Sequence, residues 1–562
     1  MRRLPVVFVI GLLVAQAPSA QRAPAFTVVE ASIADMRTAM AERRVTSREL
    51  VQQSLTRIAL YEDRLNAIIT VNPRALEEAD ERDRERRAGR VRGPLHGIPV
   101  ALKDNIQTTG MRTTGGAQAF AELVPPYDAT VTKNLREAGA VIVAKTQLTE
   151  LANWVAAGMP TNYNGLTGYG FNPYDPRRDP RPATADGRPA LAPGGSSSGV
   201  GTAVSFWAAN VGTETSGSIV NPANQNRLVG IKPTVGRVSR HGIIPITADQ
   251  DTAGPMTRSV ADAAILLGVL ESAKPDADDP ATSACMPPPG RDYTRFLDAG
   301  ALTGARIGVP RAFFSDPVTP PGASMPQGGL TEGQRAALNE AVGVLKAQGA
   351  AVVDPADFPS ILDRDPQRNF LSWPVCSGPD VPKGKDAACS TTYKYGMKRD
   401  FTRWLDLLGG TAPVKSLGEL RAWNEAHRSA GAIKYGQSNL DNADEIDLVA
   451  DKARYEADRR KDLQLTARAI DEVLQTHRLD AVLLPGPTSG GIAARAGYPT
   501  VIVPFAMVPN APTPAFPEGF RASPAPYGVS FTAGPCSEPR LIALAYAFEQ
   551  ATKRRRAPQL FP

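Results

Sequence analysis

VTKNLREAGAVIVAKT, residues 131–146, indicates the fold class of this chain. Residues 131–138 have helical character, Gly139 ends the predicted helix, and the apolar run AVIVAKT predicts a buried strand. The same alternation returns with short apolar strands expected within residues 305–310, 480–486 and 500–504. It favours an α/β fold: one large domain over residues 24–562, with a mixed, mostly parallel β-sheet covered by helices on both faces.

Upstream of this stretch, the segment TSRELVQQSLTRIALY predicts a helix. Thr46 and Glu49 have the spacing of a capping box at its start. The segment GPLHGIPVALKDNI follows, and its alternating Ile98, Val100 and Leu102 predict a short strand that ends at Lys103.

Composition and charge narrow the function classes. The 562 residues are 42% hydrophobic and 21% charged, with a net charge of +6 and no concentrated basic arm. We therefore expect a globular protein without a nucleic-acid partner. Residues 1–20 resemble a signal peptide, with Arg2 and Arg3 before an apolar run and small residues for cleavage near Ser19 or Ala20. The mature protein is expected to be exported, periplasmic or secreted, and free of the membrane; the sequence does not indicate its oligomeric state.

The cysteines and histidines carry little evidence for a metal. His96, His241, His427 and His477 are scattered and form no ligand pair, so neither a metal nor another cofactor is expected. Cys376 and Cys389 are close enough in sequence to form a disulfide in an oxidising compartment, and two free thiols are the alternative. Cys285 and Cys536 are isolated in sequence.

Two segments are predicted to be additions to the domain. Residues 172–193 are rich in Pro, Arg and Asp and predict a surface loop. Residues 359–450 predict a helical insertion that contains Trp373, Trp404 and Trp423. These tryptophans fit either helix packing or an aromatic cover over a substrate pocket.

The run GGSSSG raises the question of which serine reacts. The pattern from Gly195 to Gly199 matches the G-x-S-x-G nucleophile elbow, which would make the chain an α/β-hydrolase-type esterase with Ser197 as nucleophile and His241, His427 or His477 as base. The preceding DGRPALAP is a poor strand, although an elbow requires one. The alternative base is a lysine that burial keeps neutral, with a second serine relaying the proton. That arrangement would use Lys103, one serine of GGSSSG, and Ser218 in GTETSGSI.

Six motifs in order give the chain a resemblance to the amidase signature family, serine hydrolases with a Ser–cisSer–Lys triad. They are GPLHGIPVALKDNI, AGAVIVAKT, GGSSSG, GTETSGSIVNPA, VGIKPTVGRVSRHGIIP and DTAGPMTRSVADAA. The resemblance covers about residues 46–264, with a weaker echo in LLPGPT and in the final helix. It implies the amidase signature fold, with Lys103 as base, Ser196 as relay and Ser218 as nucleophile. It also implies an oxyanion hole built from the backbone amides of Thr215, Ser216, Gly217 and Ser218.

The chain departs from the family pattern in three places. The interval from Ser196 to Ser218 is two residues shorter than usual, and we expect the loss to shorten a helix and turn within SFWAANVG. Ser216 and Val220 stand where many members have Gly and Arg. The run from GTETSGSIV to GIIPI instead resembles the exported peptide-amidase branch.

The sequence therefore predicts an exported amidase that hydrolyses linear carboxamide C–N bonds of a small-molecule or peptide substrate by acyl transfer. An amidotransferase component that works on mis-acylated transfer RNA is disfavoured by the export signal. A non-catalytic exported binding protein on an amidase scaffold would be expected to have lost one of the three triad residues, and all three are present in this sequence. Candidate pocket-lining residues follow the KTQLTEL segment: Asn153, Trp154, Met159 and Thr161.

Overall fold

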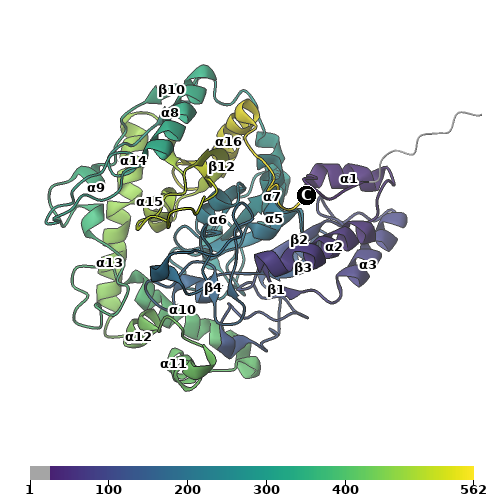
Figure 1. Ribbon diagram of the computed structural model, residues 1–562, viewed down its shortest axis with the longest axis horizontal. Coiled ribbons are helices and arrows are strands. Elements are labelled where there is room, and N and C mark those ends of the chain that lie inside the picture. The colour runs from purple at the N-terminus through teal and green to yellow at the C-terminus, as the bar shows by residue number, and fades with distance from the viewer. Residues whose placement is uncertain (1–25) are drawn as a thin grey trace, which may run out of the picture.

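The computed structural model describes residues 26–562, so the predicted signal peptide lies outside the described residues (Figure 1). The helices are α1 Ile33–Ala41, α2 Ser47–Leu65, α3 Ala75–Arg87, α4 Thr130–Glu137, α5 Val200–Ala203, α6 Val220–Gln225, α7 Val260–Leu270, α8 Glu332–Ala347, α9 Pro359–Leu362, α10 Thr392–Leu408, α11 Leu417–Ala426, α12 Ser438–Asp444, α13 Lys452–Leu465, α14 Ala467–Thr476, α15 Ser489–Ala496 and α16 Glu538–Thr552. Among the described residues, no helix is both long and apolar enough to cross a bilayer.

An 11-stranded sheet runs through the molecule in the order β1-β3-β2-β6-β8-β7-β12-β13-β11-β9-β10, and a separate hairpin pairs β4 with β5. The strands are β1 Ile68–Val71, β2 Pro99–Lys103, β3 Val141–Thr146, β4 Tyr163–Asn164, β5 Gly168–Tyr169, β6 Ala209–Glu214, β7 Val229–Lys232, β8 Thr252–Thr257, β9 Arg306–Gly308, β10 Ala351–Val353, β11 Ala481–Pro485, β12 Thr500–Val508 and β13 Ala525–Thr532. Every strand expected from the sequence is present.

Parallel pairing is confined to two blocks, β3-β2-β6 and β11-β9-β10. The strands between the blocks pair antiparallel, as do β1 and β3. The single α/β domain with a mixed sheet is confirmed. More of the neighbouring strand pairs are antiparallel than we expected. The central strands β8 and β13 contain Gly and Pro, which weaken a strand pattern in sequence, and they take part in many of these antiparallel pairs.

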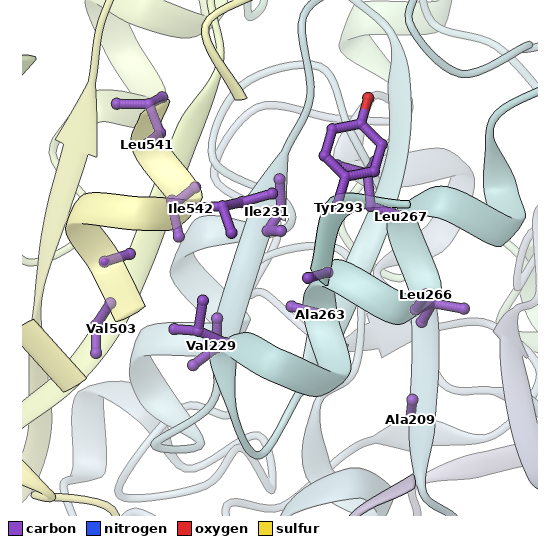
Figure 2. Packing of buried hydrophobic residues seen from close by; sticks show 14 of the residues in the cluster. Ala209, Val229, Ile231, Ala263, Leu266, Leu267, Tyr293, Val503, Leu541 and Ile542 are labelled. Carbon is purple, nitrogen blue, oxygen red and sulfur yellow. The ribbon is translucent and has the colours of Figure 1, made fainter. Parts of the chain in front are cut away.

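Alternate residues of each strand enter opposite layers, as the pleat requires. In β12, Val501 and Val503 join the large core under α7, α8 and α16, whereas Ile502 faces α6 on the other side. In β2, Val100 and Leu102 point to the first layer and Ala101 packs with α2 and α3. Figure 2 shows the first layer, where α7 and α16 lie against the sheet. The helices on both faces hold the strand ends in fixed positions.

Residues 359–450 contain the helices α9 to α12, of which α10, α11 and α12 lie in the lower part of Figure 1. Trp404 packs edge-on against Phe120 in a second apolar cluster that unites α10 and α11 with the segment around Trp154. Trp373 donates its indole N–H to Asp462, and Trp423 stacks on His427. These contacts agree with the packing interpretation of the tryptophans.

The segment SFWAANVG differs from the prediction. We expected a helix and turn, but the helix α5 ends at Ala203, residues 205–208 form a turn, and β6 begins at Ala209. Phe206 and Trp207 are fully buried against α2 and α3, so tertiary packing determines the local conformation.

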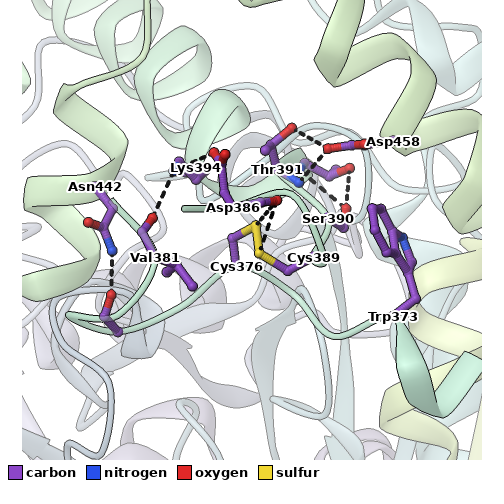
Figure 3. Close-up of a disulfide and its surroundings, with 12 residues drawn as sticks. Trp373, Cys376, Val381, Asp386, Cys389, Ser390, Thr391, Lys394, Asn442 and Asp458 are labelled. Atoms are coloured by element: carbon purple, nitrogen blue, oxygen red, sulfur yellow. Dashed lines mark hydrogen bonds and ion pairs between the residues drawn. A yellow bond between two sulfur atoms is a disulfide. The ribbon is translucent and has the colours of Figure 1, made fainter. Parts of the chain in front are cut away.

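Two disulfides cross-link the described residues, which contain no free cysteine. Cys376–Cys389 matches one of the two alternatives that the sequence allowed, and it lies just before α10 (Figure 3). Cys285–Cys536 was not foreseen, because its partners are 251 residues apart and only the fold brings them together.

We predict that replacing both Cys376 and Cys389 by serine lowers the free energy of unfolding by about 3 kcal/mol, because the unfolded chain gains the entropy of a short open loop. Denaturant unfolding of the oxidised protein measures this loss. Peptide mapping without reduction is the matching check on the native protein. Recovery of Cys376 and Cys389 as free thiols would contradict the pairing.

Candidate active site

The candidate catalytic residues meet where parallel strands end. Lys103 is the last residue of β2, and Leu102 pairs with Val211 of the parallel strand β6. The carboxyl ends of parallel neighbours lie at the same edge of a sheet. Lys103 is therefore close to the end of β6, and Ser218 follows four residues after that strand.

A chain of polar contacts joins the three predicted residues. The Oγ atoms of Ser196 and Ser218 are 2.6 Å apart, and Nζ of Lys103 is 3.5 Å from Oγ of Ser196. Nζ also donates to Oγ1 of Thr213 at 2.8 Å and to its carbonyl oxygen at 3.3 Å. A neutral amine has two N–H groups and one lone pair. With Thr213 accepting both N–H groups, the lone pair is left for Ser196.

Burial determines the charge of this lysine. Lys103 is 0% exposed, and desolvation lowers its pKa to about 7, while Asp251 and Glu214 act in the opposite direction. No carboxylate forms an ion pair with Lys103 within the described part of the chain. A substantial neutral fraction therefore exists at neutral pH, as a general base requires.

Two glycines allow the serines to approach each other. Gly195 has φ +42°, and a Cβ there would lie 2.6 Å from Cδ of Pro222 and 3.2 Å from Cα of Ser218. Gly217 also has a positive φ, +85°. A side chain at Gly195 would push Ser196 away from Ser218.

The resemblance implies a cis peptide bond at the relay serine, and the structure differs on this point. In residues 26–562 the cis bonds are Asp354–Pro355 and Thr513–Pro514, and the bond before Ser196 is trans. A cis bond before a residue other than proline costs about 3–4 kcal/mol. The polar contacts above are formed with this trans bond.

A buried carboxylate holds the turn after Ser218. Oε2 of Glu214 accepts the N–H groups of Ile219 at 2.6 Å and Val220 at 2.9 Å, at the start of α6. These two amides are therefore unavailable to a substrate. Amides at the beginning of the turn are not used in this way: among the described residues, the N–H groups of Ser216, Gly217 and Ser218 donate no hydrogen bond.

The segment predicted to form the oxyanion hole is anchored through the side chains of Thr215 and Ser216. Oγ1 of Thr215 donates to Asp251 at 2.5 Å, and Oγ of Ser216 donates to the carbonyl of Gly490. Ser216 is exposed and Ser218 is 8% exposed, so solvent reaches the turn on this side. The turn that contains Ser218 therefore has three N–H groups without an acceptor in residues 26–562.

Ser197, the elbow candidate, has a different environment. It is fully buried, donates to the carbonyl of Thr213 at 3.1 Å and accepts the N–H of the same residue at 3.3 Å. No histidine ring hydrogen-bonds to Ser197 in residues 26–562. Ser197 ties the serine loop to β6 and lacks the base that an elbow mechanism needs.

The four pocket candidates are not equivalent. Trp154 packs edge-on against Tyr393 with ring centroids 4.9 Å apart. Met159 is buried in the same apolar cluster, consistent with packing. Asn153 is partly buried with Oδ1 unpartnered, and Thr161 is partly buried as well; neither forms a side-chain hydrogen bond in the described structure.

Sequence reasoning missed five residues beside the site: Thr213, Glu214, Gln250, Asp251 and Tyr393. Four lie in or next to the motifs GTETSGS and DTAGPM, of which only the serines and the backbone amides were interpreted. Tyr393 belongs to the insertion, and nothing in its local sequence points to the site. Residues 26–562 contain no cluster of His, Cys, Asp and Glu suited to a metal ion.

Comparison with known proteins shows which proteins this chain resembles over most of its length. The family model described as Amidase matches residues 49–542. A probable amidase from Arabidopsis thaliana is 32% identical over 95% of this chain and 92% of its own length. A glutamyl-tRNA(Gln) amidotransferase component from a Synechococcus strain is 31% identical over 92% of this chain and 97% of its own.

Among solved structures, the peptide amidase from Stenotrophomonas maltophilia is similar with a TM-score of 0.77 and 36% identity, covering 94% of this chain and 98% of that one. A second structure shows the peptide amidase PAM with the competitive inhibitor chymostatin, with a TM-score of 0.78. Both similarities extend over nearly the whole domain.

Proposed function

Because this chain belongs to the amidase family, an enzyme class that acts on amides, we propose that it is an exported hydrolase of linear carboxamide C–N bonds that works through Lys103, Ser196 and Ser218. The observation that carries the proposal is the continuous set of contacts from Nζ of Lys103 through Oγ of Ser196 to Oγ of Ser218.

The reaction is acyl transfer in two halves. Ser218 gives its proton to Ser196 as Ser196 gives its own to the neutral amine of Lys103, and Oγ of Ser218 forms a bond to the substrate carbonyl carbon. When the tetrahedral intermediate collapses, the C–N bond breaks and the proton returns through Ser196 to the leaving amine. Water then attacks the acyl-enzyme by the same route, which releases the acid and restores Ser218.

The backbone amides of residues 215–218 are proposed to stabilise the negative oxygen of the intermediate. Preorganised N–H groups aimed at the developing charge stabilise it without reorganisation during the reaction. The N–H groups of Ser216, Gly217 and Ser218, which have no acceptor in the part of the chain that the structure describes, support this role. The positive φ of Gly217 lets the chain turn so that consecutive amides converge.

The substrate is proposed to be a peptide or small-molecule amide, supported by the similarity to the peptide amidase. Export is proposed from the charged and apolar pattern of residues 1–20. An exported enzyme would not meet the cytoplasmic RNA that an amidotransferase serves. The test is an activity screen over peptide C-terminal amides, aryl amides, fatty amides and carbamates, with Ser218→Ala as control. Absence of turnover in all four classes would contradict the proposal.

We predict that kcat/KM rises with pH along an acid limb near pH 7, because Lys103 must lose its proton to act as base and burial lowers its pKa to about 7. The rate is low below this pKa, where the ammonium form dominates, and levels off above it. A pH–rate profile measures the limb. The control is His241→Gln, which should leave the limb unchanged. Disappearance of the acid limb in a histidine variant would show that this histidine, and not Lys103, is the base.

A further inference from the structure

The carbonyl of Thr215 is held from two sides by groups outside the predicted triad. Nε2 of Gln250 donates to this oxygen at 3.1 Å, and the hydroxyl of Tyr393 donates to it at 3.3 Å. Nε2 of Gln250 also donates to the Tyr393 hydroxyl at 3.0 Å. The Thr215 carbonyl oxygen, the Gln250 amide and the Tyr393 hydroxyl are therefore each hydrogen-bonded to the other two.

This oxygen belongs to the same peptide group as the N–H of Ser216. A peptide group is planar and trans, so fixing the direction of its C=O fixes the N–H in the opposite direction. Donors on the carbonyl also polarise the peptide group and make its N–H a stronger donor. Asp251 completes the restraint, because it accepts from Oγ1 of Thr215 while its other oxygen accepts the N–H groups of Ile246 and Thr247.

We propose that Tyr393 is a positioning residue for the oxyanion turn, and that the helical insertion reaches the catalytic turn through it. The inference rests on the proposed function, because it concerns the amide of Ser216 as an oxyanion donor. Tyr393 touches no reacting atom and acts through the peptide group of Thr215 and Ser216.

The position of Tyr393 is itself strongly restrained. The residues just before it are held by α13: Asp458 accepts the N–H and hydroxyl of Thr391, and Asp462 accepts the hydroxyls of Ser390 and Thr392. The disulfide at Cys389 closes the same segment (Figure 3). Trp154 packs against the ring, and burial raises the pKa of the phenol, which stays a hydrogen-bond donor at working pH.

The chain offers a matched control two residues away. Tyr395 lies on the same helix, is 4% exposed against 6% for Tyr393, and donates its hydroxyl to a backbone carbonyl, that of Leu448. Tyr393→Phe and Tyr395→Phe therefore each remove one hydroxyl that donates to a backbone carbonyl, but only the first removes a bond to the oxyanion turn; the Tyr395 ring instead stacks on Tyr455.

The experiment compares both variants in the full mature enzyme with a peptide C-terminal amide. We expect Tyr393→Phe to lower kcat and the rate constant of fluorophosphonate labelling about three- to tenfold, with KM changed less than twofold, as for one lost hydrogen bond. Tyr395→Phe is expected to keep both rates. Gln250→Met removes the second donor to the Thr215 carbonyl. It is also expected to lower kcat while leaving KM nearly unchanged. Equal thermal midpoints of the two tyrosine variants would separate positioning from general stability.

Equal kcat and labelling rates in Tyr393→Phe and Tyr395→Phe would overturn the inference, as would an effect confined to KM. The proposed function fails separately: it is contradicted if Ser218→Ala keeps its turnover. An inactive Ser218→Ala together with an unaffected Tyr393→Phe would reject only the role of Tyr393.

Discussion

Ser218→Ala is expected to reduce kcat on the order of 10⁶-fold and to abolish labelling by a fluorophosphonate. The reason is that Oγ of Ser218 is 2.6 Å from Oγ of Ser196, and that the N–H groups of residues 216–218 donate no hydrogen bond within residues 26–562. Loss of the nucleophile in a serine hydrolase removes nearly all catalysis, leaving only what binding and the oxyanion hole supply. Turnover of a peptide amide and gel-based labelling measure the two effects.

Ser197→Ala is the matched control for this prediction. It removes a hydroxyl from the loop that contains Ser196, and this hydroxyl forms two hydrogen bonds with the backbone of Thr213. The expected change is about 1 kcal/mol in stability, with most activity kept. The elbow hypothesis predicts the reverse result, with Ser197 indispensable and Ser218 replaceable. An active Ser218→Ala enzyme would show that a different serine is the nucleophile.

Lys103→Met is expected to lower kcat by about 10²–10⁴-fold, the contribution of a general base. Methionine keeps most of the buried volume, so the loss reflects the amine rather than a cavity. Residual turnover in this variant should lack the acid limb near pH 7. Stopped assays over a pH series measure both effects.

The three residues are expected to act as one unit. Ser196→Ala should cost a similar factor, and the Ser196→Ala/Lys103→Met double variant should be little worse than either single variant, because a broken relay is not broken further by losing its base. Multiplicative losses in the double variant would contradict a shared proton path. Thermal midpoints identify any variant that fails to fold.

The α/β class could be predicted from sequence because it follows from local patterns. The capping box of Thr46 and Glu49 begins α2, and the apolar strands ending at Lys103 and Thr146 lie where expected. Pairing direction depends on long-range contacts, which a local pattern does not contain. The Gly and Pro residues of β8 and β13 concealed strands whose stability comes from neighbours on both sides.

The same contrast between local patterns and long-range contacts applies to the candidate site. The proposed catalytic residues lie in motifs of small and polar residues. These motifs indicated Lys103 and Ser218, the family resemblance selected Ser196 among three serines, and the fold brings the three residues together. Groups that support them come from elsewhere in the chain. Tyr393 lies 178 residues from Thr215, and its role depends on how the insertion packs. The pairing of Cys285 with Cys536 was hidden for the same reason.

The most direct test is peptide mapping of the adduct formed by a fluorophosphonate on the native enzyme. Our account predicts a single modified peptide that contains Ser218, with modification prevented in Ser218→Ala and slowed in Lys103→Met. Ser196 and Ser197 should remain unmodified, since one is the relay and the other is bonded to β6. An adduct on Ser197, or on any residue other than Ser218, would contradict the proposed mechanism.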